Sequence, residues 1–172
     1  MVKNGFTLIE LLVYVAVLAI IITLSVLFTL GIIEAAAKSA AKEEVQVNIA
    51  NIIQSFDFEI RHAQALYVPT SDFIGDPGQL SFVSPRNLPA NESETYVDMY
   101  LDEGRFCLKR EVSGVSCITS LGVEVTSLTF ERIVQPGGAE SVQIRFSIRN
   151  KIPKVEYQFQ ETIQTSARLR SY

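Results

Sequence analysis

Hydrophobic residues are concentrated near the start of the chain, and the rest of the sequence mixes apolar and polar residues as a globular domain does. Residues 6–33 are almost all apolar, and the stretch from Leu11 to Ile33 contains no charged residue. A helix of these roughly 23 residues would be about 35 Å long, which is enough to cross the hydrocarbon layer of a bilayer. The pattern predicts one membrane helix followed by one folded domain.

The charges beside this apolar segment predict its orientation. Lys3 precedes it, and Glu34 and Lys38 follow it. The positive-inside rule leaves the N-terminus in the cytoplasm, so we expect the folded domain to be exported. A secretory signal peptide is the rival interpretation, but its apolar core is about 7–15 residues long and ends in a small-residue cleavage site. Here the apolar run is longer, and no such site follows before the helix continues.

Helical spacing continues beyond the membrane segment. Residues 34–66 contain neither Pro nor Gly and many strong helix formers, so the helix should continue and end before Pro69. Small residues at 35–41 form a neck between membrane and domain. The apolar residues then repeat with a helical period, so one face of the helix should pack on a sheet. These residues are Val45, Ile49, Ile52, Ile53, Phe56, Ile60 and Ala63.

After Pro69 the pattern changes to the alternation that is typical of strands. The expected fold class is α+β, with one long N-terminal helix packed on an antiparallel sheet formed by residues 79–172. We predict strands at residues 80–83, 96–101, 105–108, 123–134, 142–148 and 155–169, with turns or loops at 75–78, 102–104 and 135–138.

The charge balance narrows the classes of partner. The chain has 15 Lys and Arg residues against 19 Asp and Glu residues, a formal net charge of −4, which argues against a strongly basic nucleic-acid binder. The late basic residues alternate with apolar ones, which places them on the solvent face, so we expect no nucleic-acid partner. These residues are Arg145, Arg149, Lys151, Lys154, Arg168 and Arg170.

Glu10 is the anomalous residue of the membrane segment. A carboxylate at the centre of a bilayer costs on the order of 3 kcal/mol, and less near the interface. On position alone, Glu10 is either a functional group or a side chain that water solvates at the membrane boundary. Its neighbours favour a function.

The string Gly5-Phe6-Thr7-Leu8-Ile9-Glu10 resembles the processing motif of the type IV pilin and type II secretion pseudopilin family. The match covers every position of the motif, and the long apolar helix follows at once. The resemblance implies that residues 1–5 are a leader, that a prepilin peptidase cuts after Gly5, and that Phe6 is then N-methylated. Residues 6–33 would be the transmembrane and assembly helix, and residues 34–172 the exported pilin-like domain. No enzymatic activity and no cofactor are implied.

Cleavage would also create a partner for Glu10. The new α-amino group of Phe6 is cationic at neutral pH, and Glu10 lies four residues on, on the same helix face and near the positive end of the helix dipole. A carboxylate buried in a filament needs a cation. We therefore expect Glu10 to pair with the amine of its own chain or of an adjacent one, and pairing across chains would set the axial register of assembly.

The resemblance also implies partners and a location. The partners are other pilin or pseudopilin subunits, the prepilin peptidase, an inner-membrane assembly platform, and membrane lipid before assembly. The location is the inner membrane, followed by the pilus or pseudopilus. The membrane helix lacks the Pro found in many major pilins, and residues 165–170 resemble the tail of J-type minor pseudopilins, so a minor, priming or tip role is favoured. A permanently anchored sensor or adhesin with an uncleaved helix is the alternative from another class.

Cys107 and Cys117 are the only cysteines. Export would place them in an oxidising compartment, where a disulfide across a hairpin is plausible and would contribute roughly 2–3 kcal/mol through a loop of about ten residues. The alternative is two separate buried thiols. Two cysteines without a nearby histidine do not indicate a metal site.

The other polar residues considered, His62 and five acids, do not indicate a catalytic or metal-binding site. His62 is the single histidine and stands near the end of the predicted helix, without visible partners for catalysis or metal binding. The acids in the predicted turns and strands lack the ordered spacing of calcium ligands, and we interpret them as surface residues. They are Asp72, Asp76, Asp98, Asp102 and Glu103.

Overall fold

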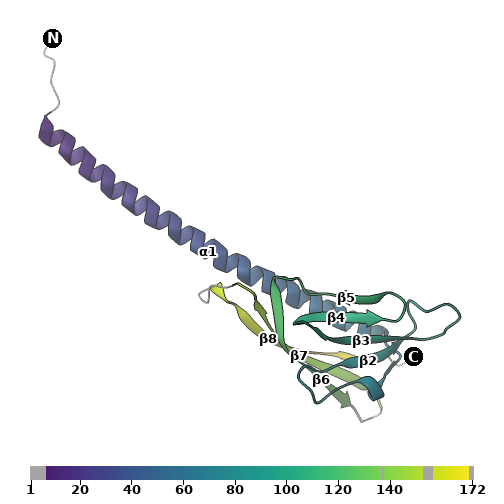
Figure 1. Cartoon of the computed structure of the whole chain (residues 1–172). Helices are drawn as coiled ribbons and strands as arrows, with labels where there is room; N and C mark the ends of the chain where they lie inside the picture. Colours follow the sequence, from purple (N-terminus) through teal and green to yellow (C-terminus); the bar gives the residue numbers. More distant parts are fainter. Residues whose placement is uncertain (1–6, 137, 153–156, 171–172) are drawn as a thin grey trace. The chain divides into compact units, whose positions relative to one another are not determined.

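The computed structural model describes residues 7–136, 138–152 and 157–170. The chain forms two compact units, Met1–Ala40 and Ala41–Tyr172, and one α-helix, α1 (Leu8–His62), runs through both (Figure 1). Residues 1–6, which include Gly5 and Phe6, lie outside the described residues, as do residues 137, 153–156 and 171–172.

The first unit is the apolar part of α1. Its side chains are exposed all around the helix, and the helix is long and apolar enough to cross a membrane. Three hydroxyls interrupt the apolar surface: Thr23, Ser25 and Thr29 each donate a hydrogen bond of 2.8 Å to the backbone carbonyl four residues earlier. These polar groups are therefore satisfied within the helix, as an apolar environment requires.

The second unit combines the last part of α1 with two antiparallel sheets. The strands are β1 (Ala65–Leu66), β2 (Leu80–Ser84), β3 (Thr95–Asp102), β4 (Arg105–Arg110), β5 (Gly114–Cys117), β6 (Val123–Val134), β7 (Glu140–Asn150) and β8 (Gln160–Arg168). The first sheet has the order β1-β2-β3-β4-β5 and the second the order β6-β7-β8. A short 3₁₀ helix, η1 (Val68–Thr70), follows β1.

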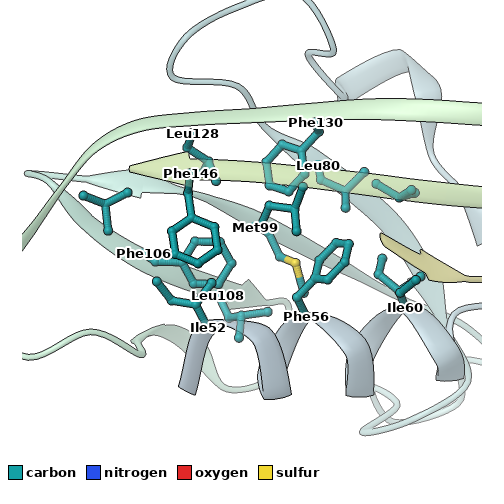
Figure 2. Packing of buried hydrophobic residues seen from close by; sticks show 14 of the residues in the cluster. Ile52, Phe56, Ile60, Leu80, Met99, Phe106, Leu108, Leu128, Phe130 and Phe146 are labelled. Atoms are coloured by element: carbon teal, nitrogen blue, oxygen red, sulfur yellow. The ribbon is translucent and has the colours of Figure 1, made fainter. Parts of the chain in front are cut away.

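One hydrophobic core joins the helix to both sheets. The helix contributes the face that its apolar period predicts, and Ile52, Phe56 and Ile60 lie among side chains from the strands (Figure 2). Burial of each large apolar side chain contributes about 1.5–3 kcal/mol. The main strand residues of the core are Leu80, Phe82, Val97, Met99, Phe106, Leu108, Val123, Val125, Leu128, Phe130, Val142, Ile144, Phe146 and Ile148.

The expected α+β fold is confirmed, with a long N-terminal helix packed on antiparallel strands. The hairpin of β3 and β4, the limits of β6 and the alternation of β7 also follow the predictions. One difference is that the strands form two sheets instead of one. The edge of β6 is bonded to loops of the first sheet. The Val125 N–H donates to the carbonyl of Gly104, in the turn between β3 and β4, at 2.8 Å, and the N–H of Gly78, in the loop before β2, donates to the Leu128 carbonyl at 2.7 Å.

The end of the helix was predicted wrongly. Helix α1 ends at His62 and not at residue 66, because the next backbone groups pair with the edge of β2. The Gln64 N–H donates to the Val83 carbonyl at 2.9 Å, and Ala65 and Leu66 form strand β1. An available strand edge therefore overrides the helical propensity of these residues.

The last strand is shorter than predicted. Strand β8 begins at Gln160, and Val155 lies outside the described residues. Just before β8, two backbone groups bond to the side chain of buried Asn150 and not to the backbone of a neighbouring strand. This side chain accepts a hydrogen bond from the Phe159 N–H and donates one to the Tyr157 carbonyl, both at 2.8 Å.

Candidate assembly site

The start of α1 places Thr7 and Glu10 in a reciprocal arrangement. The N–H groups of Glu10 and Leu11 donate to the Thr7 carbonyl at 3.1 and 3.2 Å, so Thr7 is the residue that caps the helix. Oε2 of Glu10 accepts long hydrogen bonds from the Thr7 N–H at 3.4 Å and from the Thr7 hydroxyl at 3.3 Å. A threonine at the cap with a glutamate three residues later is the sequence of a capping box.

This arrangement fixes a carboxylate at the positive end of the helix dipole. Glu10 is exposed, and within the described residues its hydrogen bonds use Oε2, which leaves Oε1 for another donor. Glu10 was predicted from the sequence as a partner for an amine, whereas its bond to Thr7 was not predicted. The signal for that bond was present in the T-x-x-E spacing.

Two polar contacts, from Asn48 and Glu59, hold the helix against a loop and a strand of the domain, and neither was predicted from the sequence. The side-chain oxygen of Asn48 accepts a hydrogen bond from the Ser120 N–H at 2.8 Å. Glu59, which is 6 % exposed, forms an ion pair with Arg110 on β4. Each signal was visible as a polar residue on the apolar face of the helix, because Asn48 and Glu59 stand at helical spacing from Ile52 and Phe56.

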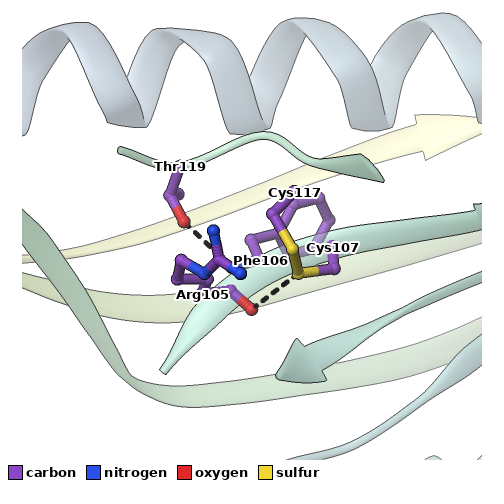
Figure 3. The surroundings of a disulfide bond; sticks show 5 residues. All are labelled: Arg105, Phe106, Cys107, Cys117 and Thr119. Atoms are coloured by element: carbon purple, nitrogen blue, oxygen red, sulfur yellow. Dashed lines mark hydrogen bonds between the residues drawn. A yellow bond between two sulfur atoms is a disulfide. The ribbon is translucent and has the colours of Figure 1, made fainter. Parts of the chain in front are cut away.

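Cys107 and Cys117 are joined by a disulfide (Figure 3). They are directly opposite one another in the register of β4 and β5, with their Cα atoms 3.9 Å apart, and Cys107 is fully buried. Beside them the Thr119 hydroxyl accepts a hydrogen bond from the Phe106 N–H at 3.1 Å. The disulfide ties the edge strand β5 to β4 and so to the rest of the first sheet.

Three of the five acids considered as calcium ligands, Asp72, Asp76 and Asp98, have structural partners of their own. Asp72 accepts hydrogen bonds from the N–H groups of Gly75 at 2.8 Å and Ile74 at 3.0 Å, and these bonds lower the pKa of its carboxyl group. Asp76 accepts from the Ser127 hydroxyl and the Leu128 N–H, and Asp98 accepts from the Ser81 hydroxyl. These bonds stabilise turns and strand edges.

Among the residues that the structure describes, one set of potential metal-ligand atoms lies within 4.8 Å: those of Asp102, Cys107 and Cys117. Both sulfur atoms belong to the disulfide, so this set offers one carboxylate and no thiolate. His62 is the last residue of α1, and its Nδ1 lies 2.6 Å from the Phe58 carbonyl oxygen.

The late basic residues do not form one stripe. Arg149 pairs with Glu124 at 2.7 Å, and Arg145 donates to the side chain of Gln164. Lys154 lies outside the described residues. Arg168 and Arg170 instead lie near the end of α1, where they line a cleft with Arg61 and His62.

Comparison with known families gives one match, to a model described as the prokaryotic N-terminal methylation motif, over residues 1–26. No curated protein and no solved structure matches the chain. The matched segment contains the Thr7–Glu10 cap and the first part of the apolar helix. Together with the pilin-like fold, it suggests a pilin or pseudopilin subunit of the inner membrane and then of a pilus. Over these residues the motif points to the type IV pilin and pseudopilin family and so to a structural role.

Proposed function

We propose that this chain is a structural subunit of a type IV pilus or of a type II secretion pseudopilus. In this proposal residues 1–5 are removed by a prepilin peptidase, and Phe6 becomes the N-methylated first residue. The observation that carries the proposal is the match to the methylation motif over residues 1–26. It is supported by the position of Glu10 in the first turn of a helix that continues with a long apolar segment without charged residues.

Glu10 would have two tasks in succession. In the single chain its Oε2 satisfies the Thr7 N–H at the helix start. In the filament its Oε1 would accept the α-amino group of Phe6 from a neighbouring chain, since a carboxylate among apolar helices requires a cation. One pairing per neighbour would fix the axial stagger between the subunits. We propose this pairing as the assembly register.

The apolar part of α1 supports assembly by lateral packing. Its side chains are exposed in the isolated chain; Phe28, for example, is 71 % exposed. Lipid covers such a surface before assembly, and neighbouring helices would replace the lipid in a filament. Van der Waals packing then takes the place of the contacts with acyl chains. The hydroxyls of Ser25 and Thr29 do not oppose this, because each already has a partner in its own helix.

Within the family, we propose a minor, priming or tip subunit that resembles the J type of pseudopilin. Its partners would be other subunits and the inner-membrane assembly platform. Three features support this role: the membrane segment has no Pro, α1 runs without interruption to His62, and the domain is built mainly of strands.

The test is the intact mass of the full chain, taken from the membrane fraction of cells with and without the peptidase. The proposal predicts a chain that begins at a methylated Phe6 when the peptidase is present and at Met1 when it is absent. A Gly5→Leu variant should begin at Met1 in both strains, because a side chain at this position obstructs the scissile bond. A wild-type chain that begins at Met1 in both strains would instead support a permanently anchored sensor or adhesin.

A further inference from the structure

Strand β8 forms a long open edge of the second sheet. It pairs with β7 on one side, and no other strand of the described residues pairs with its outer side. The outer edge of β6 is already bonded to Gly104 and Gly78, and the edge strand β5 has only 4 residues. Strand β8 has 9 residues, so it offers the longest edge without such bonds in the described part of the domain.

The hydrogen bonds at the two ends of β8 show which of its backbone groups are free. The Asn150 N–H donates to the Phe159 carbonyl at 3.2 Å, and the Leu169 N–H donates to the Glu140 carbonyl at 3.0 Å. The register between these ends is continuous, and successive residues of a strand direct their backbone groups to opposite sides. The odd-numbered residues therefore bond β7, and the N–H and carbonyl groups of the even-numbered residues point outward. These residues are Gln160, Thr162, Gln164, Ser166 and Arg168.

This edge lacks the features that protect sheet edges from pairing with another chain. Protected edges are short, carry Pro or several charges, or contain a bulge. Strand β8 contains neither Pro nor Gly, its register has no bulge, and Arg168 is the only charged residue among those with outward backbone groups. An edge of this kind is a template to which an extended segment can add as a further strand.

Strand β8 runs beside the last part of α1. Near the start of the strand, the Lys42 Nζ lies 5.8 Å from the centroid of the Phe159 ring. Just beyond its end, Leu169 lines a cleft with Arg61. Ile53 stands between these two contacts on the helix. It follows Lys42 by 11 residues (53 − 42), which is about three turns and brings it to the same side of α1.

The core is incompletely covered along this edge. The inward side chains of Ile144 and Phe146 on β7 are fully buried, because β7 has a strand on either side. Ile163 on β8 and Ile53 on α1 pack against the same core but remain partly exposed. A further strand beside β8 would direct every second side chain toward α1 and would cover both residues.

We propose that the outer edge of β8 receives an extended segment of a different subunit of the same filament. The inference rests on the proposed function, because a minor subunit has subunits of other sequences as its neighbours. The segment that fits alternates apolar side chains, which cover Ile53 and Ile163, with polar ones that face solvent. An acidic residue opposite Arg168 completes the match, because Arg168 is exposed and has no acidic partner within the described residues.

The test changes one backbone group of the edge in the full-length chain and measures the fraction of the protein in sheared filaments of the native host. Ser166→Pro removes an outward N–H and no bond to β7. This fraction should fall about fivefold or more, because the added strand loses a hydrogen bond and meets the proline ring. Ser166→Ala keeps the N–H and is the matched control, which should assemble like wild type. Thermal unfolding of both variants checks that the domain is equally stable.

A second measurement identifies the occupant and does not depend on the proline variant. A photo-crosslinking benzophenone side chain is placed at position 164, in the middle of β8, and irradiated in intact cells. It should join this chain to a protein of different sequence that also carries the N-terminal methylation motif. The same group at position 109, an exposed position on β4 of the first sheet, should not give this product.

The outcomes separate this contact from the proposed function. If the wild-type chain never enters filaments, the proposed function is wrong and the contact falls with it. If a stable Ser166→Pro chain assembles like wild type, the contact is wrong and the function stands. An equal loss in Ser166→Ala assigns the effect to the side chain and overturns strand addition. A crosslinked product of two copies of this chain, or a partner without the motif, rejects the occupant. If Ser166→Pro does not fold, the crosslink alone decides.

Discussion

The Asn48 side chain on α1 and the Ser120 backbone on the loop before β6 are joined by a hydrogen bond of 2.8 Å across 72 positions of sequence. Asn48 is 4 % exposed and also donates to the Glu44 carbonyl at 2.8 Å. The Asn48 amide thus fixes the loop against a helix whose inward positions are apolar apart from Asn48 and Glu59. It acts as a polar anchor in a mainly hydrophobic interface.

Replacing Asn48 with Ala should lower the free energy of unfolding by about 1–3 kcal/mol, because the helix loses a bond and Ser120 loses its acceptor. The measurement is urea unfolding of the full chain in detergent, followed by tyrosine fluorescence. Asn51→Ala changes an exposed residue of the same helix and should have almost no effect. Equal stability of the two variants would show that the anchor is dispensable.

For the Glu59–Arg110 pair, we expect the loss of one charge to destabilise the domain more than the loss of both charges. Arg110→Met leaves the carboxylate of Glu59 buried without a cation and should cost about 3 kcal/mol. The double variant Glu59→Leu/Arg110→Met removes both charges, so it should be more stable than the single variant. Chemical unfolding of the two proteins gives the comparison, with Lys109→Met as the control for loss of an exposed cation. A double variant less stable than Arg110→Met would contradict this account.

The disulfide predicts a link between redox state and stability. Cys117→Ser should destabilise the domain by about 2–3 kcal/mol, because an open chain has more conformational freedom when unfolded. Wild-type protein in a strong reductant should show the same loss, and the variant should be insensitive to reductant. Thermal unfolding with and without reductant provides the data. A variant that still responds to reductant would mean that another process is being measured.

Asp72 predicts a local effect of acid. The N–H groups of Gly75 and Ile74 stabilise the charged carboxylate, which lowers its folded-state pKa. Its stabilisation is therefore complete above the ordinary pKa of an aspartate and is lost as the pH falls through the lowered value. Amide exchange at Ile74 and Gly75 should accelerate over that range after correction for intrinsic rates. In Asp72→Asn the pH dependence should disappear, and its persistence would assign the effect to another acid.

Much of the fold could be predicted because burial imposes a period. Val45, Ile49 and Phe56 share a helical face, and Ile144 and Phe146 alternate with polar residues, so the packed surfaces were visible in the sequence. The turn at Asp102–Gly104 was equally visible from its residues. The division into two sheets was not, because it depends on how the β6 edge meets Gly104 and Gly78.

The candidate site was only partly predictable. The motif around Glu10 could be recognised because it is contiguous, and Cys107 and Cys117 flank a short hairpin. The basic cleft could not be predicted, because Arg61 and Arg168 are far apart in the sequence and come together only in the folded domain. The partners of Asn48 and Glu59 were hidden for the same reason, although their place on an apolar face marked them as residues in need of a partner.

The most direct test of the central claim is filament assembly by Glu10→Leu in the native host. The variant should still be cleaved after Gly5, which intact mass will show, yet its fraction in sheared filaments should fall about tenfold or more because the Phe6 amine loses its buried partner. Glu34→Leu, which removes a carboxylate beyond the apolar segment, is the matched control and should assemble like wild type. A correctly processed Glu10→Leu chain that forms filaments as abundantly as wild type would contradict the account.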